Sequence, residues 1–437
     1  MRTRQRLASL ILCGCISWAG AVSARGVVHD AVVHWNEITM TAVTAGRPGP
    51  FGTLDMALVQ VAVHDAVQAI EKRFEPYHVE IKGARGARSA AVAAAAHDVL
   101  VGFYPAQAPA LDAAYFNYLA DKGLGHDPGL AVGQQVAAGI LPLRRMPPEL
   151  LPPPFVGEAS PGVWRPTDSF NANPPPPFSP MLTPWLANID PFTLTSPARF
   201  RAAPPPALTS GRYTRDYNEV KALGAADSTV RTPAKTDLGY FYTENFFTQW
   251  NRALRSISAR YVHRTGDSAR LFALANLAMA DAVIACWDSK KFYVYWRPLT
   301  AIQEGDADGN PHTVGDPTWR PLTNNPNYPD YPSGANSVAA AMTRTLALFF
   351  GTDKLTFEVT SVAPLAVKKS RIYRRFSEAA QDMVDARVYV GIHFRFADTA
   401  ARAQGNRVAD WTFNHFLLPL HDDKHDRHGH HEGRDEN

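Results

Sequence analysis

Apolar residues recur at three- and four-residue intervals along most of the chain, and this period predicts amphipathic α-helices. The pattern runs through 27–143, where the first helices should pack against the later ones. It resumes near Tyr213 and is clearest over 268–293, whose small and apolar residues form a face suited to close packing. Further helices are predicted at 337–350, 378–390 and 395–418. The sequence therefore predicts an all-α protein.

A proline-rich segment, 146–206, separates the two helical parts and includes the runs 152–154 and 174–177. Proline at this density cannot continue a helix. Aromatic residues are spread through the segment, whereas a disordered linker contains few of them. We therefore expect the segment to wrap over the helical core and to contribute to the rim of a pocket.

The first 24 residues have the pattern of a secretory signal peptide: three arginines, an apolar stretch, and small residues ending at Ala24. The apolar stretch is shorter than the roughly 20 residues that a membrane span needs, so no stable membrane insertion is expected. Cleavage after Ala24 predicts a periplasmic or secreted protein. A lipoprotein signal around Cys13 and Cys15 is the less favoured alternative.

These patterns divide the chain into a signal peptide (1–24), an N-terminal helical part (25–145), a proline-rich wrapping segment (146–210), a helical core (211–418) and a tail (419–437). The tail is rich in histidine and acidic residues and is expected to be disordered, with loose zinc or nickel binding as the less favoured alternative.

The net charge of +3 over 437 residues gives no electrostatic argument for a nucleic-acid partner.

Candidate chemistry lies in three clusters between residues 290 and 398. Their basic and small polar members are Lys290 and Arg297, then Ser333 and Gly334, then Arg387 and His393. Two guanidinium groups and one ammonium group can offset the charge of a bound oxyanion. A serine hydroxyl, a glycine amide and the start of the helix that follows them add neutral donors. Histidine is the one member that can attack phosphorus or coordinate a metal centre. The sequence therefore predicts a single anion pocket.

The three clusters read Lys-x6-Arg-Pro, Pro-Ser-Gly and Arg-x5-His, and this order resembles the signature of the vanadium-dependent haloperoxidases and the type 2 phosphatidic acid phosphatases. Trp287 is placed as in the chloroperoxidase branch, and 391–396 is similar to the bacterial haloperoxidase sequence. The resemblance implies a helical bundle of the vanadium haloperoxidase and acid phosphatase type. It also implies a vanadate cofactor, with phosphate as a competing occupant, bonded to His393 and held by Lys290, Arg297, Ser333, Gly334 and Arg387.

Two positions depart from that signature. Ala335 stands where the family carries a histidine, and general acid–base assistance of the kind that a histidine gives is worth about 100- to 10,000-fold in rate. The neighbouring Asn336 cannot titrate. Four residues separate His393 from Asp398, where the phosphatase pattern has three. Asp398 is therefore either the residue that orients His393 or merely part of the next helix.

Three functions remain open. The first is a vanadate-dependent haloperoxidase-like oxidoreductase that uses peroxide to oxidise halide, weakened by Ala335. The second is a phosphomonoesterase with His393 as its nucleophile, and the third is a non-catalytic phosphate- or vanadate-binding protein. All three predict small-molecule substrates or ligands, and the oligomeric state stays open.

Two His-Asp pairs, 64–65 and 97–98, lack a further ligand at metal spacing, so hydrogen-bonded helix residues are their favoured interpretation.

Overall fold

The computed structural model describes residues 30–47, 49–50, 52–144, 159–167 and 181–420. The predicted signal peptide, part of the proline-rich segment and nearly all of the predicted tail lie outside the described residues. Their boundaries stay predictions.

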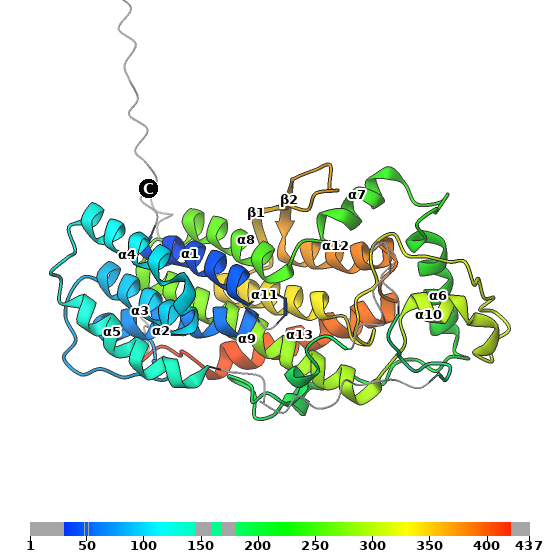
Figure 1. Cartoon of the computed structure of the whole chain (residues 1–437), viewed down its shortest axis with the longest axis horizontal. Coiled ribbons are helices and arrows are strands. Elements are labelled where there is room, and N and C mark those ends of the chain that lie inside the picture. The colour runs from blue at the N-terminus through cyan, green and yellow to red at the C-terminus, as the bar shows by residue number, and fades with distance from the viewer. Residues whose placement is uncertain (1–29, 48, 51, 145–158, 168–180, 421–437) are drawn as a thin grey trace, which may run out of the picture.

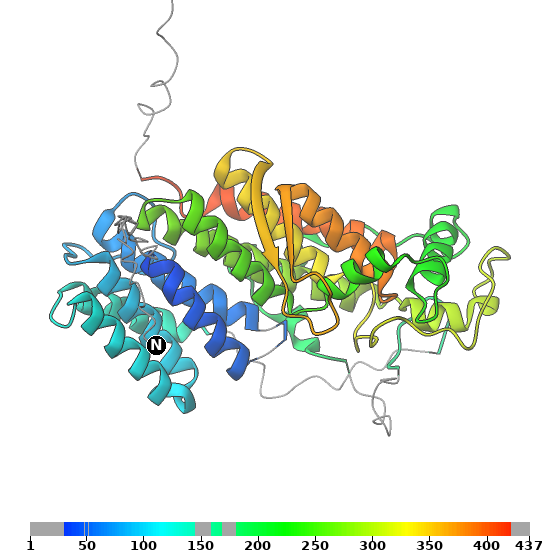
Figure 2. The same ribbon diagram turned by 90° about the horizontal axis from the view of Figure 1, so that it is seen from above.

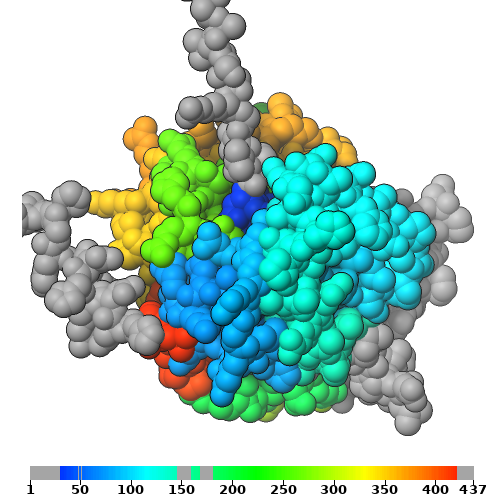
Figure 3. Space-filling view, turned by 90° about the vertical axis from the view of Figure 1, so that its left-hand side faces the viewer, coloured from blue at the N-terminus to red at the C-terminus, as the bar shows by residue number. Residues whose placement is uncertain are grey.

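Helices dominate the described chain, as the apolar periodicity predicts (Figure 1). One end of the molecule is built from the N-terminal helices, coloured blue to cyan in Figure 3. They are α1 (Ala31–Gly46), α2 (Gly52–Glu71), α3 (Arg88–Phe103), α4 (Ala108–Lys122) and α5 (Gly129–Ile140), with the short 3-10 turns η1 (Pro105–Gln107) and η2 (Leu141–Leu143).

The remaining elements follow the proline-rich segment, whose described part contains η3 (Pro184–Asn188) and η4 (Pro197–Phe200). They are α6 (Gly211–Gly224), α7 (Pro233–Phe241), α8 (Phe246–Tyr261), α9 (Thr265–Tyr293), α10 (Pro298–Gln303), η5 (Gly305–Ala307), α11 (Gly334–Phe350), β1 (Lys354–Thr360), β2 (Ser370–Arg375), α12 (Phe376–Tyr389) and α13 (Arg395–His415).

Helix α9 is the centre of the bundle, and α2, α11 and α13 pack along it. Nearly all of its side chains are buried, because its small and apolar residues allow neighbouring helices to approach closely. Close packing extends to α13 against α11, where a Cβ atom added at Gly405 would lie 2.2 Å from the carbonyl oxygen of Ser337. Among the described residues, α9 alone has the length and composition of a membrane-crossing helix, and its most apolar 18-residue stretch is entirely buried inside the protein.

The described part of the proline-rich segment lies on α9, and a buried carboxylate is among the groups that hold it there. Asp281 of α9 accepts hydrogen bonds from the backbone amides of Phe192, Thr193 and Leu194 at 2.7, 2.7 and 3.1 Å. Trp185 belongs to the main hydrophobic core. The described part of the segment therefore covers the helical core, as its aromatic residues led us to expect.

Strands β1 and β2 form an antiparallel hairpin that the sequence analysis did not predict (Figure 2). Phe357 and Val359 on β1 and Tyr373 on β2 are buried, while their neighbours along each strand are more exposed. This alternation is the signal of a half-buried strand, but it spans only seven and six residues. The bundle is helical as predicted, and the hairpin is an addition to it.

Both His-Asp pairs are hydrogen-bonded helix residues, which confirms their favoured interpretation. Asp65 accepts from three backbone amides, and His64 contacts the carbonyl oxygen of Glu75. His97 bonds Asp98 at 2.7 Å and Asp112 at 2.8 Å. Within the described ranges, no group of three or more His, Cys, Asp or Glu residues could hold a metal ion.

We predict that His97 makes the stability of the folded chain depend on pH. Burial opposes its charged form, but the hydrogen bonds that it donates to Asp98 and Asp112, together with the charges of these carboxylates, outweigh burial and raise the pKa of His97 above 6.5. The ion pairs therefore stabilise the protein fully below pH 6.5, and this contribution is lost as the pH rises through the raised pKa. His97→Gln should flatten the dependence of Tm on pH across that range. The exposed His312→Gln is the control, and an unchanged slope in His97→Gln would contradict the assignment.

Candidate functional site

The six residues predicted from the three clusters converge at one buried place, each presented by the end of a helix or by the loop beside it. Lys290 lies in the last turn of α9, Arg297 caps α10, and Arg387 lies in the last turn of α12. The others are Ser333 at the N-cap of α11, Gly334 as its first residue, and His393 in the loop before α13. Each of these side chains is buried, as is the Gly334 backbone.

Lys290 and Arg297 are bonded to the loop that precedes Ser333. The Lys290 ammonium donates to the carbonyl oxygens of Pro329 and Asp330 at 2.5 and 3.1 Å. The Arg297 guanidinium donates from Nε to the carbonyl oxygen of Tyr328, and from Nη1 to that of Ile392, both at 2.6 Å. The two cations also lie 5.0 and 4.7 Å from the centre of the Tyr328 ring. These contacts fix both cations in position.

Several donors at this place are not used by the protein itself. Arg297 Nη2 and Arg387 Nε are buried and have no hydrogen-bond partner in the described part of the chain. The side chain of Ser333 does not cap α11, so the helix presents an uncapped N-terminus. Buried donors without partners are rare, and guanidinium groups beside a helix N-terminus are a site for an anion. These residues therefore fit a tetrahedral oxyanion such as vanadate or phosphate.

Gly334 allows the backbone to approach this site closely. A Cβ atom added there would lie 3.1 Å from Cζ3 of Trp287, so a larger residue would push the start of α11 away from the indole ring. Trp287 in turn belongs to α9, one turn before Lys290. The indole ring of Trp287 therefore packs against the first residue of α11.

The electrostatics of the site favour the binding of an anion. Burial lowers the pKa of Lys290 to about 8, and the nearby charge of Arg297 adds to this effect. Burial likewise lowers the pKa of Arg297 and of Arg387. Cations that are kept from water gain stability from an anion placed among them.

His393 is oriented by Asp330, which the sequence analysis missed. His393 Nδ1 lies 2.6 Å from Asp330 Oδ1, and both side chains are buried. Burial and the three neighbouring cations lower the pKa of His393 well below 6.5, which favours the neutral ring. With Nδ1–H donated to Asp330, Nε2 keeps its lone pair and can act as a ligand or a nucleophile.

Asp398 does not orient His393, so the first of its two predicted roles is wrong. Its Oδ1 accepts a hydrogen bond from Asn336 Nδ2 at 2.7 Å, within the first turn of α11. Asp330 is the partner of His393 instead, and it lies three residues before Ser333 in the turn that precedes α11. That position beside the second cluster was the signal available in the sequence.

A cavity of about 470 Å³ opens onto this site. Arg387 and His393 line it, with Tyr328 and the partly exposed Ala335, while Lys290, Arg297 and Ser333 are not among its lining residues. No described residue of the proline-rich segment lines the cavity, so the expectation that this segment contributes to the rim is wrong for its described part.

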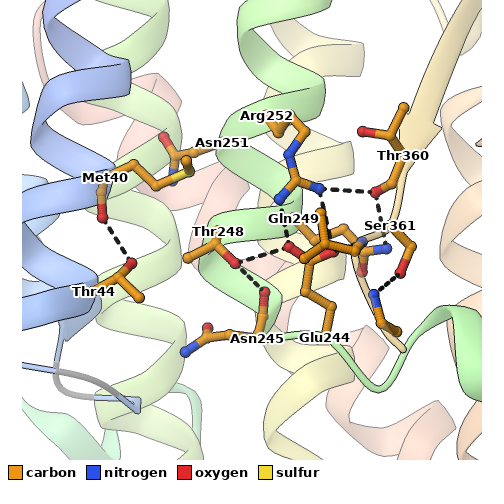
Figure 4. Close-up of polar contacts among 12 residues, drawn as sticks. Met40, Thr44, Glu244, Asn245, Thr248, Gln249, Asn251, Arg252, Thr360 and Ser361 are labelled. Carbon is orange, nitrogen blue, oxygen red and sulfur yellow. Dashed lines mark hydrogen bonds and ion pairs between the residues drawn. The ribbon is translucent and has the colours of Figure 1, made fainter. Parts of the chain in front are cut away.

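The other lining residues come from the end of α7, the start of α8 and the loop between them, from the loop of the hairpin, from the turn between α1 and α2, and from the stretch 322–326. They include Tyr240, Glu244, Asn245, Phe246 and Leu365. Glu244 is bonded by other residues of the protein. Its carboxylate pairs with Arg252 at 2.6 Å and accepts from Thr248 Oγ1 at 3.2 Å (Figure 4), and from the Val362 amide at 2.9 Å.

Known proteins resemble the chain over this region and beyond it. Residues 270–421 match the family model of the VCPO second helical-bundle domain. The vanadium chloroperoxidase of Curvularia inaequalis is 28% identical, over 55% of this chain and 50% of its own length. The chain therefore spans about half the length of this curated relative.

Solved structures share the fold over nearly the whole described chain. A bacterial vanadium-dependent iodoperoxidase superposes with a TM-score of 0.72 at 23% identity, covering 88% of this chain and 97% of its own. A bacterial vanadium-dependent chloroperoxidase in its holo form gives a TM-score of 0.66 at 19% identity, covering 85% of this chain and 93% of its own. The bundle predicted from the sequence is thus confirmed. The chain is thus similar in sequence to a vanadium chloroperoxidase over about half its length, and it shares the helical-bundle fold of the vanadium-dependent haloperoxidase structures.

Proposed function

We propose that the protein is a vanadate-dependent haloperoxidase-like enzyme that uses peroxide to oxidise halide. The observation that supports this most is the donor set around His393. Buried guanidinium groups with unused donors surround an imidazole whose Nε2 carries a lone pair. This set can hold an oxyanion electrostatically and also bond to its central atom. The names of the relatives, a chloroperoxidase and an iodoperoxidase, support the same class of reaction.

Each residue has a distinct task in this proposal. Lys290, Arg297 and Arg387 balance the charge of the bound oxyanion, while Ser333 and the Gly334 amide donate to its oxygens. His393 Nε2 would bond the central atom of the oxyanion, and Asp330 holds its ring in the required tautomer. Vanadate, when bound, supplies a Lewis-acid centre that activates peroxide.

A phosphomonoesterase with His393 as its nucleophile is the second candidate. The same neutral Nε2 suits attack on phosphorus. The cavity of about 470 Å³ beside it offers room for the organic part of a phosphate ester.

The deciding experiment loads the mature chain with orthovanadate and with phosphate in parallel titrations. Bromide or iodide oxidation by peroxide and hydrolysis of p-nitrophenyl phosphate are then measured on the same preparation. We expect tight vanadate binding with peroxide-dependent halide oxidation. Hydrolysis without oxidation would establish the phosphatase. Binding of either anion with neither activity would establish the non-catalytic binding protein.

We also propose that the enzyme acts in the periplasm or outside the cell. The pattern of the first 24 residues supports export, and the cleaved protein should begin at Arg25. N-terminal sequencing of protein from fractionated cells tests this, and an uncleaved cytoplasmic chain would contradict it.

We predict that Ala335→His raises activity about 10-fold or more. Ala335 lines the cavity beside His393 and Tyr328, so an imidazole there could exchange a proton with a peroxide or a leaving group. Steady-state rates at equal vanadate occupancy measure the gain. Ala335→Gln fills similar space without titrating and is the matched control. A folded, loaded Ala335→His variant with no gain would show that the chain does not lack proton transfer at this position.

A further inference from the structure

Three apolar side chains are exposed on the loop 361–369, which joins the two strands of the hairpin. Val362 is 66% exposed, Leu365 64% and Val367 85%. Single apolar side chains on a surface are common, but several of them on one short segment mark a contact surface or a binding groove. The residues that would hold the oxyanion leave this loop without a task.

The loop is bonded to carboxylates near both of its ends. Near the first end, Glu244 accepts a hydrogen bond from the Val362 amide at 2.9 Å. Near the other end, Asp237 accepts from the amides of Val367 and Lys368 at 2.6 and 3.1 Å. These bonds fix the backbone of the loop. Its exposed apolar side chains are therefore already in place for a ligand, which lowers the entropic cost of binding.

Leu365 connects this loop to the cavity of about 470 Å³, because it lines that cavity together with Arg387 and His393. The charged side chains of the lining are Arg387, at the anion site, and Glu244, which pairs with Arg252 at 2.6 Å. The other lining residues are neutral, and six of them are aromatic or apolar: Tyr240, Phe246, Leu322, Pro326, Tyr328 and Ile392. A cavity of this size and lining suits a small organic molecule with an apolar ring.

We propose that this cavity binds an apolar aromatic acceptor of the oxidised halogen, and that Leu365 provides selectivity for it by packing on the ring. A small molecule is favoured over a protein or lipid surface because Leu365 lines the same cavity as His393, whereas a larger partner would cover only the outside of the loop.

The inference rests on the proposed function in taking halide oxidation as the reaction at the site. The hypohalous acid formed there would halogenate an electron-rich ring. One C–H bond and the O–halogen bond break, a C–halogen bond forms, and the ring proton leaves with the hydroxide as water. The ring carbon is oxidised and the halogen is reduced, so the step needs no further reactant.

Calorimetric titration of the full mature chain with 2-naphthol, without vanadate or peroxide, tests the binding. We expect Leu365→Ser to weaken the affinity about 10-fold, because it removes apolar area that the ring would bury. Leu365→Met keeps this apolar area and should bind within about 2-fold of wild type.

Ile372→Ser is the matched control for this titration. Ile372 lies on β2 of the same hairpin and is 72% exposed, but it does not line the cavity, so its substitution should leave the affinity unchanged. A wild type that does not bind 2-naphthol, or a Leu365→Ser variant that binds it as tightly, would overturn the proposal. Unchanged affinity with a lower sedimentation coefficient in Leu365→Ser would assign the loop to self-association instead.

A competition experiment tests selectivity during turnover. Phenol and 2-naphthol are supplied together with bromide and peroxide, and the ratio of brominated products is compared with the ratio that added hypobromous acid gives. We expect wild type to favour the naphthol product about 10-fold over this reference, and Leu365→Ser to lose most of the preference. A wild-type ratio equal to the reference would mean that the oxidised halide reacts in free solution, which overturns the proposal. A wild type that oxidises no bromide refutes the proposed function, while the titration still decides whether the cavity binds an apolar ring.

Discussion

His393→Ala should reduce halide oxidation by more than about 100-fold, because it removes the one protein atom placed to bond the vanadium centre. Phosphate affinity should fall much less, since Lys290, Arg297 and Arg387 remain to balance charge. Parallel titrations with orthovanadate and phosphate, together with steady-state oxidation rates, measure this difference. Equal losses for the two anions would show that His393 contributes only to the general electrostatics of the pocket.

A graded comparison strengthens this test. Asp330→Ala removes the carboxylate that bonds His393 Nδ1 at 2.6 Å but leaves the imidazole in place. Loss of such a supporting residue typically costs about 10- to 100-fold in metal affinity or activity. The control is Asp410→Ala, which removes a half-exposed carboxylate paired with Arg344. Asp330→Ala with wild-type activity would mean that packing alone holds the ring.

Asp281→Ala should lower the free energy of unfolding by about 3–5 kcal/mol. The variant leaves the amides of Phe192, Thr193 and Leu194 buried without their acceptor, and it also removes the 2.5 Å bond from Thr193 Oγ1. Urea denaturation followed by circular dichroism measures the loss. Asp410→Ala again serves as the control and should change stability by less than about 1 kcal/mol. A similarly small loss for Asp281→Ala would show that aromatic packing and the remaining polar contacts, such as the ion pair of Arg201 with Asp288, hold the proline-rich segment on α9.

The sequence predicted the bundle and the six clustered residues because both depend on short-range patterns. Helical periodicity and the three spaced motifs are local, and the resemblance to a known family joined the motifs into one pocket. The pairing of Asp330 with His393 spans 63 residues and follows from packing that no spacing encodes. The same holds for Asn336 and Asp398, whose contact spans 62 residues.

Two other features were missed for related reasons. The two strands of the hairpin are too short to show a reliable alternation of apolar and polar residues. Which of their side chains are buried depends on the surfaces against which the strands pack. Part of the rim of the cavity comes from the loop before α8, around Glu244, where no motif marks it. A rim is a property of the assembled surface, so the aromatic residues of the proline-rich segment were an unreliable guide to it.

The hydrogen bonds from Lys290 and Arg297 to four backbone carbonyl oxygens affect how much the site must change when an anion binds. These carbonyls belong to the turn before Ser333 and to the loop before His393, so the cations join the two segments with the chain's own atoms. The carbonyl oxygens therefore offset the repulsion between the two cations when no anion is bound. In the proposed enzyme the cations are thus held in place without the oxyanion, so its binding should need little rearrangement and carry a correspondingly small entropic penalty.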